Sequence, residues 1–150
     1  MIQSIKKKVN KMKINIICTS YHKPQIEKML EVVKITANEE SITIGHIYWL
    51  PGVLEIPYGI RKIISESGDK IDGFVVLGII EKGKTKHGKV IGQAVIKDLI
   101  KFQTKGGQPV GIGIIGPGAT HDQIEERLEM HAKNAVLAVS HLMKDISEWK

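Results

Sequence analysis

The chain has 150 residues, and its 42% hydrophobic and 25% charged content suits one soluble domain with its own core. No apolar run approaches the roughly 20 residues of a membrane span, and no apolar segment follows the N-terminal charges, so we expect neither a membrane protein nor a secretory signal. Cys18 is the only cysteine, which excludes an internal disulfide and fits a reducing, cytoplasmic compartment.

The net charge of +6 is partly concentrated near the N-terminus, where five lysines fall within residues 6–13. We interpret residues 1–12 as a basic tail and residues 13–150 as one domain. A nucleic-acid site would also need aromatic residues that stack on bases, and only 5% of the residues are aromatic, so we expect no nucleic-acid partner. A small phosphorylated substrate suits a basic protein equally well.

Apolar runs of strand length alternate with segments of helical periodicity along the whole domain. The runs cover residues 14–19, 42–50, 74–80 and 110–115. The helical segments carry apolar residues at helical spacing, namely Ile26, Met29, Leu30 and Val33, then Ile56, Ile60, Ile63 and Ile64, then Val90, Ile91, Ala94, Val95 and Leu99. Because strands that alternate with helices pair in parallel through right-handed crossovers, the pattern predicts an α/β sandwich.

The last helix has the clearest boundaries. We expect Gly116-Pro117-Gly118 to form a turn after the fourth strand, and Thr120 and Gln123 to form a capping box at the start of the helix. The predicted buried stripe of this helix consists of Ile124, Leu128, Ala135, Val139 and Leu142.

Ligands of parallel α/β sheets bind at the carboxyl ends of the strands, which selects the loops at residues 19–24, 51–56, 78–87 and 115–120. In the first loop, Tyr21 could stack on a heteroaromatic ring or cover the edge of the sheet. In the second loop, Glu55 could accept hydrogen bonds from ligand hydroxyl groups or cap the following helix, and the sequence favours neither.

The third loop carries the most chemistry. Thr85 can cap the next helix, whose free N–H groups would form a phosphate site, and Lys84 and Lys86 add positive charge. His87 could transfer protons near neutral pH. The competing interpretation is a solvated basic loop with a surface histidine. The loop is not a Walker motif, because the upstream glycine of that motif is missing.

Arg127 lies on the last helix, roughly 60° away from its apolar stripe. Its guanidinium group could hold a phosphate at an interface, or it could pair with Glu125 or Glu126 at the surface. The histidines of this helix do not share one face, so we expect no metal site.

Three segments, in this order, resemble the lumazine synthase family. They are the Pro-Gly-x-x-Glu-x-Pro loop at residues 51–57, the Leu-Gly-x-x-x-x-Gly-x-Thr-x-His loop at residues 77–87 and the Gln-x-x-x-Arg helix at residues 123–127. One branch of the family also has Gly-Pro-Gly-x-Thr before this helix, as at residues 116–120 here. The resemblance spans about residues 13–145.

The resemblance implies a flavodoxin-like, three-layer α/β sandwich, with a four-stranded parallel sheet and helices on both faces. It implies a transferase of riboflavin biosynthesis that condenses 5-amino-6-(D-ribitylamino)uracil with 3,4-dihydroxy-2-butanone 4-phosphate. No metal or organic cofactor is expected. Members of the family form homopentamers, some of which assemble into sixty-subunit icosahedral shells, and their active sites lie between subunits.

The resemblance also implies roles for individual residues. Contacts with the pyrimidine and its ribityl chain would come from Tyr21, Val53, Leu54, Glu55, Ile79, Ile80 and Ile112, the last in place of an aromatic residue common in the family. The phosphate would bind at Lys84, Thr85 and Arg127, with Arg127 reaching the site of a neighbouring subunit. His87 would transfer protons. Lys133 is the nearest match to a family lysine close to the site.

Some positions depart from the family pattern. Gly88 and Lys89 stand where the family usually has an aromatic–acidic or doubly acidic pair, and His22 replaces a common asparagine. Lys84 replaces a small or acidic residue, so the site is more basic than is typical. Two alternatives therefore stay open, a riboflavin synthase of the lumazine-synthase-like kind and a non-catalytic flavin-binding or shell-forming scaffold.

Overall fold

The computed structural model describes residues 11–150, so most of the predicted basic tail lies outside the described residues. Four strands pair in parallel in the order β2-β1-β3-β4, and they are β1 (Lys13–Thr19), β2 (Thr43–Leu50), β3 (Gly73–Glu81) and β4 (Val110–Ala119). The helices that follow them are α1 (Lys23–Glu39), α2 (Ile56–Glu66), α3 (His87–Thr104) and α4 (His121–Met143). The predicted alternation of strands and helices is confirmed.

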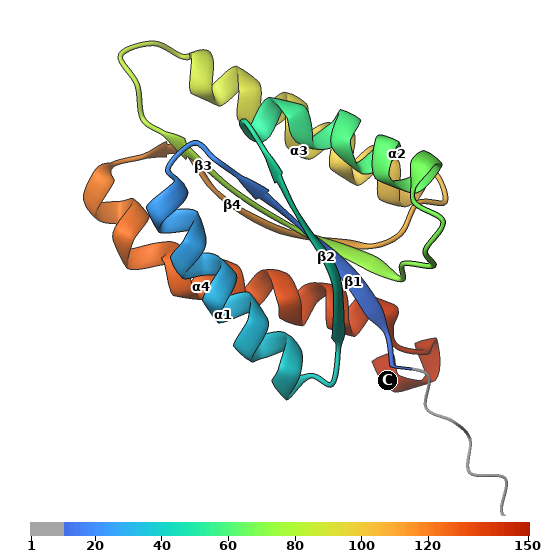
Figure 1. Cartoon of the computed structure of the whole chain (residues 1–150). Helices are drawn as coiled ribbons and strands as arrows, with labels where there is room; N and C mark the ends of the chain where they lie inside the picture. Colours follow the sequence, from blue (N-terminus) through green and yellow to red (C-terminus); the bar gives the residue numbers. More distant parts are fainter. Residues whose placement is uncertain (1–10) are drawn as a thin grey trace, which may run out of the picture.

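The helices cover the sheet in two pairs (Figure 1), with α1 and α4 on one face and α2 and α3 on the other. Side chains of β1 alternate between the two cores, since Ile16 and Cys18 face α1 and α4 whereas Ile17 faces the opposite layer. Strand β3 is buried along nearly its whole length because both of its faces are covered. The three-layer sandwich is thereby confirmed. No helix within residues 11–150 combines the length and apolarity needed to cross a membrane.

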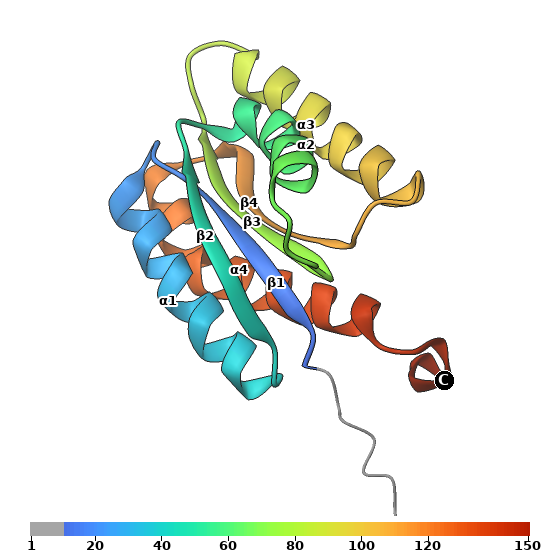
Figure 2. The same cartoon turned by 45° about the vertical axis from the view of Figure 1, so that its right-hand side comes forward.

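Helix α4 is longer than the sheet that it covers, and its last turns extend past the strands toward the short 3-10 helix η2 (Ile146–Trp149) (Figure 2). The predicted stripe is wrong at one position, because Leu142 is 43% exposed while the other four residues are buried. The predicted capping box is confirmed. The Gln123 N–H donates to Oγ1 of Thr120 at 3.4 Å, and the Thr120 N–H donates to Oε1 of Gln123 at 2.9 Å.

Strand β4 also differs from the prediction at its C-terminal end. Residues 116–118 do not form a turn that ends the strand, since β4 continues to Ala119. The pairing of β3 with β4 shifts register between Ile79 and Glu81, so the extra residues of β4 bulge away from the sheet and return. The two glycines of this segment have φ angles of 95° and 89°, which glycine adopts without a steric penalty.

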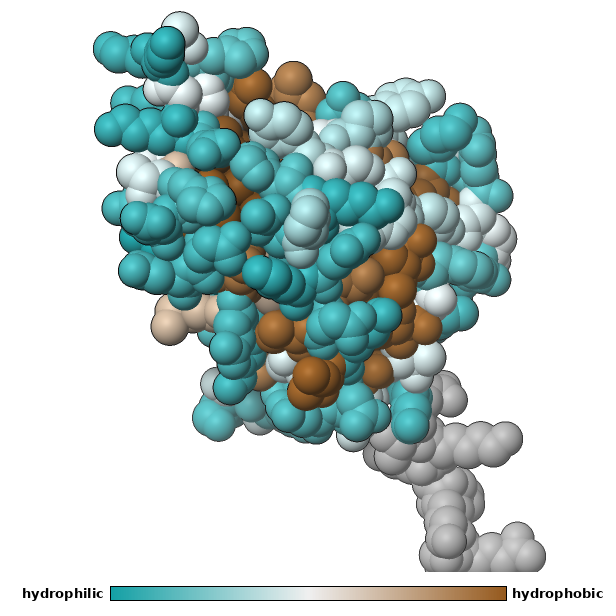
Figure 3. Space-filling view, turned by 60° about the vertical axis from the view of Figure 1, so that its left-hand side comes forward, coloured by the Kyte–Doolittle hydropathy of each residue, from teal (hydrophilic) through white to brown (hydrophobic). Residues whose placement is uncertain are grey.

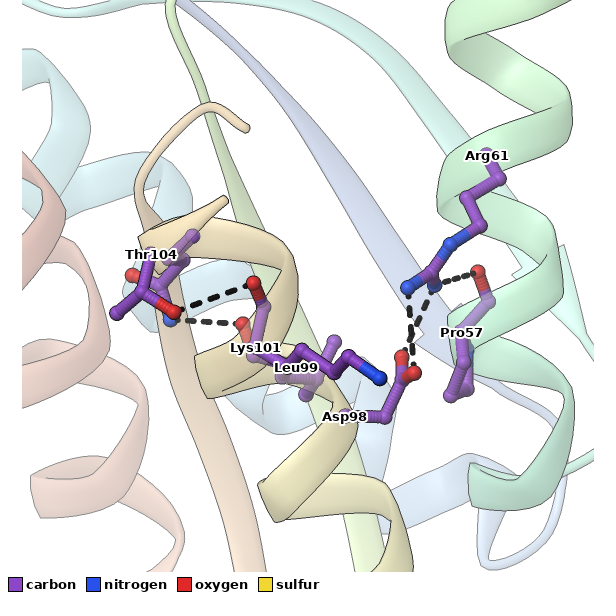
Figure 4. A network of polar contacts seen from close by, with 7 residues as sticks. Pro57, Arg61, Asp98, Leu99, Lys101 and Thr104 are labelled. Carbon is purple, nitrogen blue, oxygen red and sulfur yellow. Dashed lines mark hydrogen bonds and ion pairs between the residues drawn. The ribbon is translucent and has the colours of Figure 1, made fainter. Parts of the chain in front are cut away.

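Helices α2 and α3 are joined by a bidentate ion pair (Figure 4). The guanidinium group of Arg61 donates two hydrogen bonds, of 2.9 and 3.2 Å, to the carboxylate of Asp98, and a third of 2.9 Å to the carbonyl oxygen of Pro57. The same group lies 5.6 Å from the centre of the Phe102 ring. Bidentate pairing fixes orientation as well as distance, so this network links the exposed sides of the two helices, whose buried residues pack on the sheet.

Candidate functional site

A cleft of about 480 Å³ opens at the carboxyl ends of β1, β2 and β3. Its lining comes from Tyr21 after β1, residues 51–55 after β2, and a third group at the end of β3 and the start of α3, namely Ile79, Ile80, Glu81, Gly83, Thr85, His87, Gly88 and Ile91. This is where a parallel α/β sheet binds its ligands, and the size suits a small molecule. Three of the four loops selected from the sequence therefore contribute to one cavity.

The segment after β2 forms one wall through the 3-10 helix η1 (Val53–Glu55). Val53 is buried, whereas Leu54 and Glu55 are exposed at the cleft. Glu55 directly precedes α2, but its side chain makes no capping hydrogen bond there. Glu55 thus occupies the N-cap position of α2 as the capping interpretation expected, but its carboxylate is not used in a capping hydrogen bond and is an acceptor at the cleft.

Ile79 and Ile80 form the back of the cleft at the end of β3. Their side chains are 2% and 7% exposed, because both pack into the hydrophobic cores. These residues can therefore contact a ligand mainly through their main chain, whose N–H and C=O groups are strong hydrogen-bonding groups.

His87 and Thr85 lie together where α3 begins. The backbone N–H of His87 donates to Oγ1 of Thr85 at 3.3 Å, although Lys86 rather than Thr85 occupies the N-cap position. Both residues are exposed and both line the cleft. The start of a helix attracts anions through its free N–H groups and its dipole, so this corner of the cleft suits a phosphate.

Tyr21 also lines the cleft, and its backbone is bonded to the residue that follows β2. Its N–H donates to the carbonyl oxygen of Pro51 at 3.1 Å. Tyr21 is 63% exposed where it lines the cleft. An exposed ring at the mouth of a cleft can stack on a flat heterocycle.

The cleft of this chain does not include Lys84, Ile112, Arg127 or Lys133. Lys84 is exposed in the loop before α3, and Lys133 is exposed on α4. Ile112 lines a separate groove between β4 and α4, beside Met130 and His131.

Arg127 is exposed on α4, on the opposite face of the sheet from α2 and α3. It forms no ion pair within residues 11–150. Glu125 pairs instead with Lys28, at 3.5 Å. The surface pairing of Arg127 considered from the sequence is therefore wrong.

Arg127 has an electrostatic effect on one neighbour. Burial lowers the pKa of His131, and the positive charge of Arg127 lowers it further. A histidine in such a position favours its neutral form.

The sequence interpretation missed Glu81, which lines the cleft at the last position of β3 and lies within ion-pair distance of His22. A usable signal was present, because a lone carboxylate directly after a buried strand lies at the carboxyl edge of the sheet.

Within residues 11–150, no group of three or more His, Cys, Asp or Glu side chains has a metal-binding arrangement.

Comparisons with known proteins agree with this geometry. The family model of 6,7-dimethyl-8-ribityllumazine synthase matches residues 11–146. The protein of that name from Staphylothermus marinus is 33% identical over 131 residues, which are 87% of this chain and 86% of the relative. Those from Metallosphaera sedula and Saccharolobus solfataricus are 34% identical over 125 residues and 30% identical over 133 residues. These two alignments cover 83% and 89% of this chain, and 82% and 85% of the relatives.

Proposed function

Because the chain belongs to the 6,7-dimethyl-8-ribityllumazine synthase family, we propose that its cleft makes 6,7-dimethyl-8-ribityllumazine for riboflavin biosynthesis. The substrates are 5-amino-6-(D-ribitylamino)uracil and 3,4-dihydroxy-2-butanone 4-phosphate, and no cofactor takes part. One observation carries the proposal. An aromatic ring, a carboxylate, a helix start and an imidazole line the same cavity, and they belong to Tyr21, Glu55, Thr85 and His87.

The two substrates occupy different ends of the cleft. The pyrimidine stacks on Tyr21 and bonds to the main chain of Ile79 and Ile80, because the exposed ring and the buried side chains leave those groups available. The ribityl chain runs past Val53 and Leu54, and its hydroxyl groups donate to the carboxylate of Glu55. The sugar phosphate binds at the start of α3, near Thr85 and Lys84.

The reaction needs little chemical machinery from the protein. The amine of the pyrimidine attacks the ketone, phosphate leaves, water is released and the second ring closes. Holding the two reactants in the right geometry can lower the barrier by about 7–11 kcal/mol. His87 carries the protons between the reacting groups, and such general acid–base help contributes roughly 10²–10⁴-fold.

Arg127 completes the phosphate site from a neighbouring copy of the chain. Its exposure, its lack of an ion pair within residues 11–150 and its place on α4, away from its own cleft, support this arrangement. Ile112, in the groove that borders the same helix, and the exposed Lys133 approach the neighbour's cleft with it. The active sites then lie between subunits of a pentamer, which some relatives of this fold extend to a sixty-subunit shell.

The surface carries apolar patches that suit such contacts. Figure 3 shows a face on which hydrophobic residues gather between hydrophilic ones. Val90 and Ile100 on α3 are 61% and 51% exposed, and Met130 on α4 is 65% exposed. These residues lie on opposite faces of the sheet, and large exposed apolar residues on both faces support contacts with neighbouring copies.

Residues 13–150 then act as the single catalytic domain, with residues 1–12 as a basic tail. A cytoplasmic location is supported by Cys18, which is a free, buried thiol.

A direct assay tests the function. The purified protein is mixed with the two substrates, and lumazine absorbance and free phosphate are followed together. The expected result is equal amounts of both products. Riboflavin made from lumazine alone would identify a riboflavin synthase instead, and flavin binding without turnover would identify a scaffold.

A further inference from the structure

We propose that His22 and Glu81 form a positioning pair that holds the ring of Tyr21 at the mouth of the cleft. The inference rests on the proposed function, in which Tyr21 stacks on the pyrimidine. It adds two residues that act through Tyr21 and need not touch the substrate's reacting atoms.

The pair connects two neighbouring strands at their carboxyl ends. His22 follows β1, Glu81 ends β3, and β1 lies directly beside β3 in the sheet. Nε2 of His22 and Oε2 of Glu81 are 3.4 Å apart, with side chains that are 19% and 38% exposed. No aligned hydrogen bond satisfies the buried Nε2 of His22 within residues 11–150, and the carboxylate of Glu81 lies within ion-pair distance of it. An unsatisfied buried polar atom is costly, which favours keeping that charge close.

The backbone of His22 is held in an unusual conformation. Its φ of 62° and ψ of 41° lie in the left-handed region, which asparagine adopts more readily than most residues other than glycine. Its carbonyl oxygen accepts hydrogen bonds from the N–H groups of Gln25 and Ile26, at 3.0 and 3.1 Å, where α1 begins. The first turn of α1 thus fixes the backbone from which the imidazole extends.

The imidazole supports the ring of Tyr21. The two ring centres are 4.6 Å apart and their planes meet at 77°, an edge-to-face contact that leaves the tyrosine largely open to solvent. The adjacent Lys23 is engaged elsewhere, since its Nζ lies 5.1 Å from the centre of the Trp49 ring. Contacts therefore run from Glu81 to His22 and from His22 to Tyr21.

Two variants test the side chains of the pair without changing the backbone conformation at residue 22. His22→Asn keeps a residue that accepts the left-handed conformation and removes the imidazole, and Glu81→Gln keeps the size of the side chain and removes its charge. We expect each to weaken binding of the aminopyrimidine alone, which cannot react without the second substrate, by about two- to tenfold. The KM for the butanone phosphate and kcat should stay close to wild type. The double variant should be no weaker than His22→Asn, because both changes remove the same support.

The chain provides a matched control. Nε2 of His46 lies 3.1 Å from Oδ2 of Asp69, and its ring is 5.8 Å from the ring of Tyr48, but neither His46 nor Asp69 lines the cleft. His46→Asn repeats the substitution at a comparable pair, and it should leave binding and kinetics unchanged.

A second measurement, fluorine NMR, reports the surroundings of the Tyr21 ring directly. The chain has 3 tyrosines, so fluorotyrosine labelling produces few fluorine NMR signals, and Tyr21→Phe assigns the one from position 21. His22→Asn and Glu81→Gln should shift that signal, whereas His46→Asn should shift the signal of Tyr48. An unmoved Tyr21 signal together with wild-type binding in both variants would overturn the proposal. A wild-type protein that neither binds the aminopyrimidine nor makes lumazine would defeat the proposed function, while the fluorine signals would still decide whether the pair positions Tyr21.

Discussion

Gly78 of β3 and Val53, which lines the cleft, meet so closely that a Cβ on residue 78 would lie 2.6 Å from Cγ2 of Val53. Only glycine permits this approach, which seats the 3-10 helix η1 directly against β3. The contact therefore determines how close η1 lies to β3, and with it the position of Leu54 and Glu55, which belong to η1 and line the cleft.

Replacing Gly78 with alanine should push η1 away from β3. We expect Gly78→Ala to lower the free energy of unfolding by about 1–3 kcal/mol, the usual cost of overpacking a core, and to raise the KM for the aminopyrimidine. Urea unfolding and steady-state kinetics measure the two effects. Gly68→Ala is the control, because a Cβ there would meet nothing within 4 Å. Equal behaviour of the two variants would show that the contact does not hold the wall of the cleft.

The imidazole of His87 should affect the rate and not the binding of substrates. We expect His87→Ala to slow single turnover by about 10²–10⁴-fold without abolishing it, because positioning of the reactants remains. His121→Ala is the matched control, since His121 is the exposed first residue of α4 as His87 is of α3. Unchanged single-turnover rates in His87→Ala would refute its role in proton transfer.

Mixed oligomers test whether a site draws residues from two copies of the chain. Arg127→Ala and Glu55→Ala should each be strongly impaired. If the two variants are unfolded, mixed and refolded together, some sites combine an intact cleft with an intact neighbouring arginine. Random assembly should restore about a quarter of the wild-type activity. Mixtures no more active than their separate components would place Arg127 outside the site.

His131 should make stability depend on pH. Its pKa is lowered from the ordinary value of 6.5 by burial, and further by Arg127, so the unfolded chain binds a proton more readily than the folded one. Protonation therefore favours unfolding, and stability should fall as the pH drops below about 7. His131→Asn should flatten this part of the profile, as measured by urea unfolding at a series of pH values. A variant whose profile parallels the wild type would contradict the assignment.

The thiol of Cys18 should be unreactive in the folded protein. Burial raises its pKa to about 12, so almost no thiolate is present at neutral or mildly alkaline pH. A disulfide reagent such as DTNB should label the native protein very slowly and the urea-unfolded protein at once. Rapid labelling of the native protein would mean that β1 opens readily to solvent.

Much of this protein could be predicted from local patterns along the chain. Alternating apolar runs and helical periods predicted the parallel sandwich, because each pattern reflects burial of one element against its neighbours. The capping box at Thr120 and Gln123 was equally local. The loop residues Tyr21, Glu55 and His87 were found from the rule that strand ends share one edge of a sheet.

The tertiary structure alone decided how distant segments meet. The strand order places β1 beside β3, and this brings His22 to Glu81, which no spacing in the sequence indicates. At the end of α4, Met143 packs against the core whereas Leu142 is exposed, although Leu142 continues the apolar spacing of the helix. The helical projection placed Arg127 beside the apolar stripe of α4, but only the packing of the layers shows that α4 lies across the sheet from α2 and α3. Periodicity reports which face of an element is buried, whereas packing of whole elements determines what that face meets.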